Sequence, residues 1–242
     1  MTATPRIEVH EDASALATAV AGELLLRLTD AQTRGELPQI GLTGGTIADA
    51  VHRELARLSA SSEVDWSRVV VWWGDERFVA ADDPERNAGQ ARAAFLDAVG
   101  VDPASVHEMP STATAADVDE AAASYSELVR HHGTGAFEVL MLGVGPDGHV
   151  ASLFPGHPAL DARDAIAVAV RDSPKPPPER VSLTFEALNH ARAVWFLVSG
   201  DGKAEAVARA LGGAEVHEIP AVGVTGEDET IWFLDRASSS AL

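Results

Sequence analysis

The sequence contains no cysteine, and this absence removes several kinds of chemistry. It excludes disulfides, a thiolate nucleophile and Cys-ligated zinc or iron–sulfur centres. No uninterrupted apolar run reaches the length of about 18 residues that marks a transmembrane helix. The first residues, Met1 to Arg6, lack the apolar core of a signal peptide. We therefore expect a cytoplasmic protein.

Basic residues are also scarce: 18 Lys and Arg stand against 37 Asp and Glu, which gives a formal net charge of −19. Nucleic acids and anionic membranes both require a basic surface, so neither is expected as a partner. An acidic protein can still bind an anion locally, through helix N-termini and a few well-placed cations. The basic residues beside glycine-rich turns are therefore the most informative.

The chain has 242 residues, 46% of them hydrophobic, which is enough for a full core. Strands are predicted at 6–9, 39–42, 68–73, 137–142, 165–170, 193–198 and 230–234, and helices near 12–32, 46–59, 87–99, 116–131 and 203–211. Asp12 and Asp117 are predicted as helix N-caps. The alternation predicts an α/β fold with a doubly wound, mostly parallel, Rossmann-like sheet and helices on both faces. We expect a single domain over residues 1–242.

The predicted strand at 137–142 runs into the turn GVGPDGH, which ends at His149. Glycine reaches backbone angles denied to other residues, so this turn can be tight. It would place Asp147 and His149 at the carboxyl end of a strand, where open α/β sheets bind ligands. A carboxylate beside an imidazole indicates acid–base catalysis.

The same turn matches GxGxxG, a dinucleotide fingerprint whose last glycine must open a helix. Here Pro155, Gly156 and Pro158 leave room for about one helical turn, so dinucleotide binding is not expected. His149 and His157 could instead be metal ligands. No third ligand lies at a recognised spacing, so no metal is expected.

Two further turns follow apolar strands. The first contains Gly44, Gly45 and Thr46 and leads into a helix, a geometry that presents free N–H groups to an anion. The second places Asp75 and Arg77 directly after a buried strand, at the ligand-binding edge of such a sheet.

Three more side chains are candidates for substrate contact. Asn87 begins the next predicted helix, where it could be the N-cap or contact a substrate hydroxyl. Lys203 follows a glycine turn and opens a helix, and Arg180 follows the proline-rich connector 173–178. A glycine turn, a helix N-terminus and two cations could together clamp one phosphate.

In this order and spacing, four segments of the chain resemble the 6-phosphogluconolactonase family, and together they cover nearly the whole length. The segments are WGDERFVAADDPERN, LGVGPDGHVASLFPG, PPPERVSLT and VSGDGKAEAV. The first glycine turn departs from the usual pattern, because Thr43 and Ile47 stand where serine and proline are common. Glucosamine-6-phosphate deaminases belong to the same superfamily.

The resemblance implies hydrolysis of 6-phospho-D-glucono-1,5-lactone to 6-phospho-D-gluconate in the oxidative pentose phosphate pathway, without a cofactor. His149 would be the general base that activates water, Asp147 would orient it, and Arg77 would lie near the reacting lactone. The phosphate would be held by Gly44, Gly45, Thr46, Arg180 and Lys203.

Two other functions stay open. A glucosamine-6-phosphate deaminase would share the phosphate site but needs a further acid–base group, for which Asp75 is the nearby candidate. A non-enzymatic sugar-phosphate sensor would normally need an output domain, for which the predicted strands leave no room. The sequence does not distinguish a monomer from a homodimer.

Overall fold

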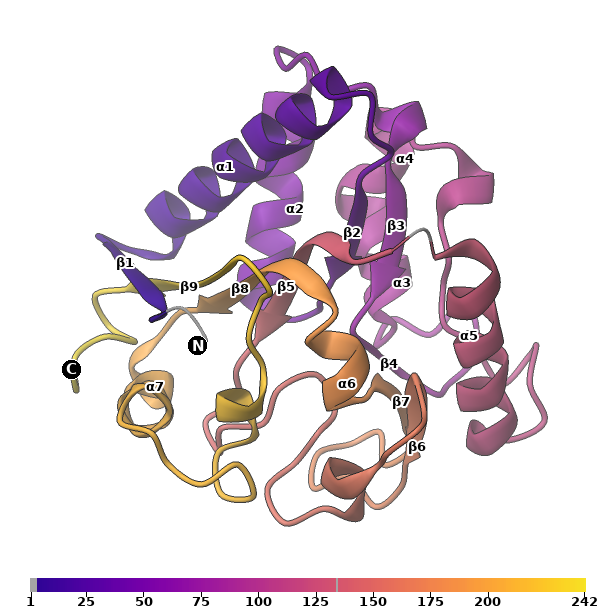
Figure 1. Cartoon of the computed structure of the whole chain (residues 1–242), viewed down its shortest axis with the longest axis vertical. Helices are drawn as coiled ribbons and strands as arrows, with labels where there is room; N and C mark the ends of the chain where they lie inside the picture. Colours follow the sequence, from indigo (N-terminus) through magenta and orange to yellow (C-terminus); the bar gives the residue numbers. More distant parts are fainter. Residues whose placement is uncertain (1–3, 134) are drawn as a thin grey trace.

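A six-stranded parallel sheet forms the centre of the computed structural model, which describes residues 4–133 and 135–242 (Figure 1). Its spatial order is β1-β9-β8-β5-β2-β3, and every neighbouring pair is parallel. The strands are β1 (Arg6–His10), β2 (Gln39–Leu42), β3 (Val70–Trp73), β5 (Phe137–Gly143), β8 (Ala191–Val198) and β9 (Glu229–Asp235). The inner strands are apolar along most of their length because both of their faces are covered.

Helices cover the two faces of this sheet (Figure 1). The chain passes through β1, β2 and β3 in one direction and then returns through β5, β8 and β9. Because crossovers between parallel strands are right-handed, the reversal puts the connecting helices on opposite faces. The helices are α1 (Ala13–Thr33), α2 (Thr46–Ser59), α3 (Asn87–Ala91), α4 (Asp97–Val99), α5 (Val118–His132), α6 (Phe185–Leu188) and α7 (Ala204–Leu211). The predicted doubly wound fold is confirmed.

The reversal creates a switch point between β2 and β5, which are neighbours in the sheet. From β2 the chain continues outward to β3, and from β5 it continues the other way to β8. The loops that leave the carboxyl ends of two such strands diverge and leave a crevice. Both glycine turns predicted to bind substrate follow these two strands.

A second, antiparallel sheet contains β4 (Asp75–Arg77), β7 (Arg180–Leu183) and β6 (Ala167–Val170). Gly74 alone separates β3 from β4, so the chain passes directly from one sheet into the other. The predicted strand at 165–170 is present as β6, in this second sheet. The predicted turn after Trp73 is wrong, because that charged segment is the strand β4. β4 consists of charged residues, so it lacks the hydrophobic pattern that would have indicated a strand.

Several local predictions can be checked at the helix ends. Asp12 and Asp117 are N-caps, and each accepts the N–H three residues on at 2.9 Å. Asn87 is not a cap, because α3 begins at Asn87 itself. A π-helical segment, Arg92–Leu96, joins α3 to α4, and α7 begins one residue after Lys203.

Short 3-10 helices fill several connections: Trp66–Arg68, Pro103–Ser105, Pro158–Asp161, Asp201–Lys203 and Pro220–Gly223. One hydrophobic cluster extends from the main sheet into the second sheet, for example from Leu140 and Trp195 to Val181 and Leu183. Within residues 4–133 and 135–242, none of the helices combines the length and apolar character needed to cross a membrane.

Candidate active site

A cavity of about 600 Å³ lies at the carboxyl edge of the main sheet, where the turns after β2 and β5 diverge. We call it the site cavity. Its wall contains every predicted site residue except Asp147: Gly44, Gly45, Thr46, Asp75, Arg77, Asn87, His149, Arg180 and Lys203. These residues come from segments spread over 160 positions of the chain, so the fold brings together what the sequence holds apart.

The turn after β5 holds Asp147 against His149. Two backbone bonds close it: the Gly145 N–H donates to the carbonyl of His149 at 2.9 Å, and the Gly148 N–H donates to that of Gly145 at 3.0 Å. His149 Nδ1 then lies 2.5 Å from Asp147 Oδ1. A Cβ at Gly145 would come within 2.0 Å of that nitrogen. Glycine is therefore required for the imidazole and carboxylate to meet here.

The electrostatics of this pair suit a base. Burial raises the pKa of Asp147, but the hydrogen bond to His149 and the charges of His149 and Lys175 outweigh it and lower the pKa to about 2. An ionised Asp147 accepts a hydrogen bond from Nδ1–H of His149. In the neutral ring, Nε2 is then unprotonated and free to accept a proton. The ring is 15% exposed and packs on Phe154 at 4.6 Å between centroids.

The strand β4 supplies three charged side chains with different roles. Glu76 is buried and accepts the backbone N–H groups of Asn87 at 2.8 Å and Ala88 at 2.9 Å, so it caps α3, and burial raises its pKa. Asp75 accepts from the Ser152 hydroxyl at 2.6 Å. Arg77 faces the site cavity, and its buried Nε has no hydrogen-bond partner in the described part of the chain.

Asn87 joins this corner to the diglycine turn. Its Oδ1 accepts from Arg77 Nη1 at 2.6 Å, and its Nδ2 donates to the carbonyl of Asp75 at 2.9 Å. A Cβ at Gly44 would lie 1.8 Å from Asn87 Oδ1, so the close approach needs glycine. Gly45, with φ +99°, then starts α2 without a side-chain cap, which leaves helix N–H groups open to a ligand.

Two basic residues predicted to bind phosphate, Lys203 and Arg180, also line the site cavity. Lys203 Nζ donates to the carbonyl of Val144 at 2.7 Å, and its pKa is lowered by burial and then by the charge of Lys175. Arg180 is only 5% exposed, and burial lowers its pKa as well. Its guanidinium lies 5.6 Å above the centre of the Phe154 ring.

The sequence-based prediction missed Lys175, which also lines the site cavity. Its ammonium is 4.0 Å from Asp147 Oδ1. A signal was present, because Lys175 and Lys203 are the two lysines of the whole chain.

His157 does not share a site with His149. Its Nε2 donates to the carbonyl of Arg171 at 2.8 Å, and its Nδ1 accepts the Ala159 N–H at 3.1 Å. No helix follows Gly148 before Pro158, so the GxGxxG segment lacks the helix that the dinucleotide fingerprint requires. Among the residues that the structure describes, no group of three or more His, Asp or Glu side chains is arranged to hold a metal.

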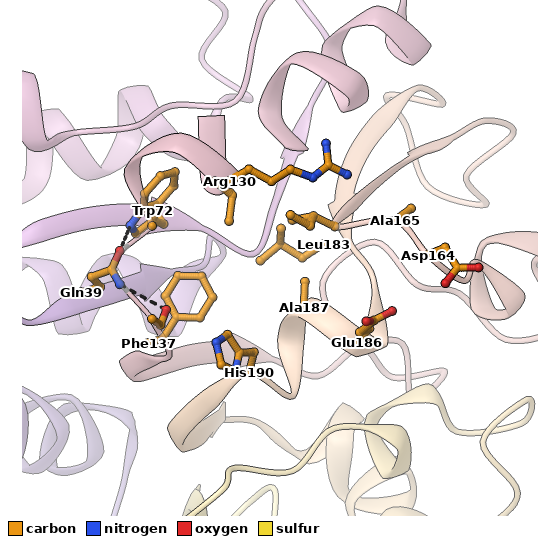
Figure 2. Close-up of a pocket in the computed structure, with 14 residues that line it drawn as sticks. Gln39, Trp72, Arg130, Phe137, Asp164, Ala165, Leu183, Glu186, Ala187 and His190 are labelled. Atoms are coloured by element: carbon orange, nitrogen blue, oxygen red, sulfur yellow. Dashed lines mark hydrogen bonds between the residues drawn. The ribbon is translucent and has the colours of Figure 1, made fainter. Parts of the chain in front are cut away.

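A second cavity, of about 530 Å³, lies at the opposite, amino edge of the sheet (Figure 2). Trp72 and Phe137 contribute apolar surface to its wall, and Gln39 is a polar residue of the same wall. Gln39 accepts from the Trp72 indole at 3.0 Å and donates to the carbonyl of Gly135 at 3.2 Å. None of the predicted site residues lines this cavity.

Comparison with known proteins agrees with this geometry. The family model described as glucosamine-6-phosphate isomerases/6-phosphogluconolactonase matches residues 11–232. A 6-phosphogluconolactonase of Streptomyces coelicolor is 44% identical, over 100% of this chain and 96% of that protein. One from Homo sapiens is 37% identical, over 96% and 90%. A crystal structure of 6-phosphogluconolactonase from Thermotoga maritima superimposes with a TM-score of 0.84 at 26% identity, covering 96% and 99% of the two chains. The chain therefore belongs to the glucosamine-6-phosphate isomerase/6-phosphogluconolactonase family.

Proposed function

We propose that this protein hydrolyses 6-phospho-D-glucono-1,5-lactone to 6-phospho-D-gluconate, a step of the oxidative pentose phosphate pathway. The observation that carries the proposal is His149, which lies on the wall of a cavity with four basic side chains and is held by Asp147 at 2.5 Å. Relatives at 36–44% identity carry the name of this activity.

The chemistry requires one base and stabilisation of an oxyanion. Neutral His149 takes a proton from water through Nε2 as the water oxygen bonds to the lactone carbonyl carbon. Arg77, which lines the site cavity, stabilises the oxyanion that forms. The intermediate collapses by breaking the bond to the ring oxygen, which receives the proton from His149. The carboxylic acid product then ionises.

The phosphate binds at the other end of the substrate. Gly44, Gly45 and Thr46 present the open N-terminus of α2, and Lys203 and Arg180 add positive charge. Asp75 and Asn87 contact sugar hydroxyls from the corner of β4 and α3. No metal or cofactor takes part in this proposal.

We further propose that residues 1–242 act as one domain, because one hydrophobic cluster joins the two sheets. We also propose that the protein works in the cytoplasm as a monomer or homodimer, with a small sugar phosphate as its partner. Light scattering on the purified protein distinguishes the two oligomeric states.

Turnover of freshly prepared lactone tests the proposed function. The product is followed with a coupled dehydrogenase, and the rate is corrected for spontaneous ring opening. Glucosamine 6-phosphate is assayed in parallel for ammonia release. We expect acceleration of lactone opening and no ammonia. Ammonia release without lactone hydrolysis would identify the deaminase alternative instead.

A further inference from the structure

The chain uses lysine at two positions only, and both line the site cavity. Every other residue counted as Lys or Arg is arginine, including those in the surface ion pairs. Arginine presents a planar fork of donors, whereas lysine presents a compact charge that reaches a single point. The retention of lysine at Lys175 and Lys203 therefore points to a requirement of the site rather than of the surface.

Arg180 fixes the backbone beside Lys175. Its Nη2 donates to the carbonyls of Lys175 at 3.1 Å and Pro176 at 3.2 Å, and its Nε donates to that of Pro177 at 3.2 Å. The connector is thus wrapped around a buried guanidinium. Ser173 closes it from the other side, because its Oγ donates to the carbonyl of Lys175 at 2.9 Å.

The two lysines carry charge that the surrounding side chains neutralise only in part. Lys203 donates to a carbonyl, and its pKa is lowered by burial and then by the charge of Lys175, which also lines the site cavity. The nearest carboxylate to Lys175, at 4.0 Å, already accepts from His149. A doubly charged anion between the ammonium groups would offset both positive charges, whereas a neutral lactone ring would not.

We propose that Lys175 and Lys203 together bind the phosphate dianion of the substrate, and that Arg180 is a positioning residue that holds Lys175 in place. This proposal rests on the proposed function for the identity of the substrate. It adds a phosphate-binding residue that the sequence-based prediction missed, and it assigns Arg180 to the connector rather than to direct contact with the phosphate.

The test that needs no turnover uses the two lysines as probes. Protein labelled with ¹³C at lysine gives one side-chain signal for each of them. Titration with inorganic phosphate should shift both signals with the same midpoint. In K175M the remaining signal should titrate with a higher pKa, because a like charge has been removed. A phosphate titration that moves only the Lys203 signal would overturn the proposal, whatever the enzyme's true substrate is.

Kinetics with the 6-phospholactone give the second measurement. K175M should raise KM about 10- to 100-fold and leave kcat within a few-fold, as expected for the loss of one charge-assisted contact. The matched control is R171M, which removes an exposed charge two residues before the connector, where Arg171 pairs with Asp119. A fall in kcat with an altered pH profile and unchanged KM would contradict the proposal. It would show that Lys175 acts on catalysis through the Asp147–His149 pair instead.

R180K tests the positioning role, because it keeps the charge but loses the fork that holds the connector. We expect its KM to rise about as far as that of K175M, and the double variant R180K/K175M to be no worse than K175M. Effects that multiply in the double variant would show that Arg180 contacts the phosphate itself. Thermal unfolding establishes that each variant is folded before its kinetics are compared.

Discussion

The two edges of the main sheet differ in the partners of their basic side chains. At the amino edge, Glu138 is buried and accepts from Arg27 at 2.8 Å and from Arg192 at 3.2 Å. Arg192 also bonds to Glu36 at 3.2 Å, and Arg27 to Glu229. Arg27 and Arg192 each bond to two carboxylates, so these ion pairs hold the helix α1 and the starts of three strands together.

At the carboxyl edge, three basic side chains bond to neutral oxygens instead. Arg77 donates to a carbonyl and an amide, Arg180 to carbonyls of the connector and Lys203 to the carbonyl of Val144. These oxygens orient the cations without cancelling their charge. A protein of net charge −19 can therefore attract an anion at this edge, because Arg77, Arg180 and Lys203 line the site cavity without direct pairing to a carboxylate.

The largest effect is expected from a substitution at the carboxyl edge that removes catalysis and leaves the ion pairs of the amino edge intact. His149→Ala should reduce kcat about 10²- to 10⁴-fold, because the general base is lost. Inhibition by 6-phosphogluconate should stay near the wild-type level, since the phosphate contacts remain. Asp147→Asn, which keeps the shape of the turn, is the companion variant and should show a smaller fall. Turnover at the wild-type rate in His149→Ala would remove His149 from the mechanism.

The two edges are best compared above acid pH, because the free energy of unfolding of the whole protein falls as the pH is lowered. His52 is fully buried against Phe95 at 4.9 Å between centroids, and burial lowers its pKa to about 4. The unfolded chain binds a proton at His52 near pH 6.5, so between pH 6.5 and 4 the unfolded state holds more protons and acid favours unfolding. His52→Leu should remove about 3 kcal/mol of this acid sensitivity at pH 4.

Urea unfolding of wild type and His52→Leu at several pH values measures that difference. The control is the same pair above pH 7, where the His52 contribution to pH dependence vanishes. Parallel stability curves for the two proteins from pH 7 to pH 4 would mean that His52 is protonated in the folded state, contrary to its burial.

The amino edge can be weakened without touching the site. Glu138→Gln should lower the free energy of unfolding by about 2 kcal/mol, because charge-assisted hydrogen bonds to a buried carboxylate are lost. Both kcat and KM should stay at wild-type values. Glu127→Gln, which breaks an exposed pair with Arg130, is the control and should change stability by less than about 1 kcal/mol. A Glu138→Gln variant with normal stability but impaired turnover would reverse the assignment of the two edges.

The smallest expected effect is that of metal removal. Treatment with EDTA should leave the rate and its pH profile unchanged, because a histidine base activates water without metal in the proposed mechanism. A zinc-bound water could produce a similar acid limb, since such water titrates near about pH 7. Activity lost to the chelator and restored by added metal would reassign His149 as a ligand.

The sequence determined the parts of this protein that depend on local pattern. Apolar runs located the strands of the parallel sheet, Asp12 and Asp117 marked helix starts, and the turn that ends at His149 placed a carboxylate beside an imidazole. These features arise from residues a few positions apart, whose spacing constrains the backbone directly.

Only the tertiary structure decided how distant segments meet. The second sheet was missed because β4 is three residues long and charged, and its partner strand β7 lies about a hundred positions away. Asn87 looked like a helix cap, but Glu76 reaches that helix from another strand and frees the amide to bond with Arg77. Lys175 joined the site because Arg180 folds the connector back, a contact between side chain and backbone that no periodicity encodes. Local sequence therefore set the long helices and the strands of the main sheet, whereas long-range packing set the second sheet and the side chains that share the cavity.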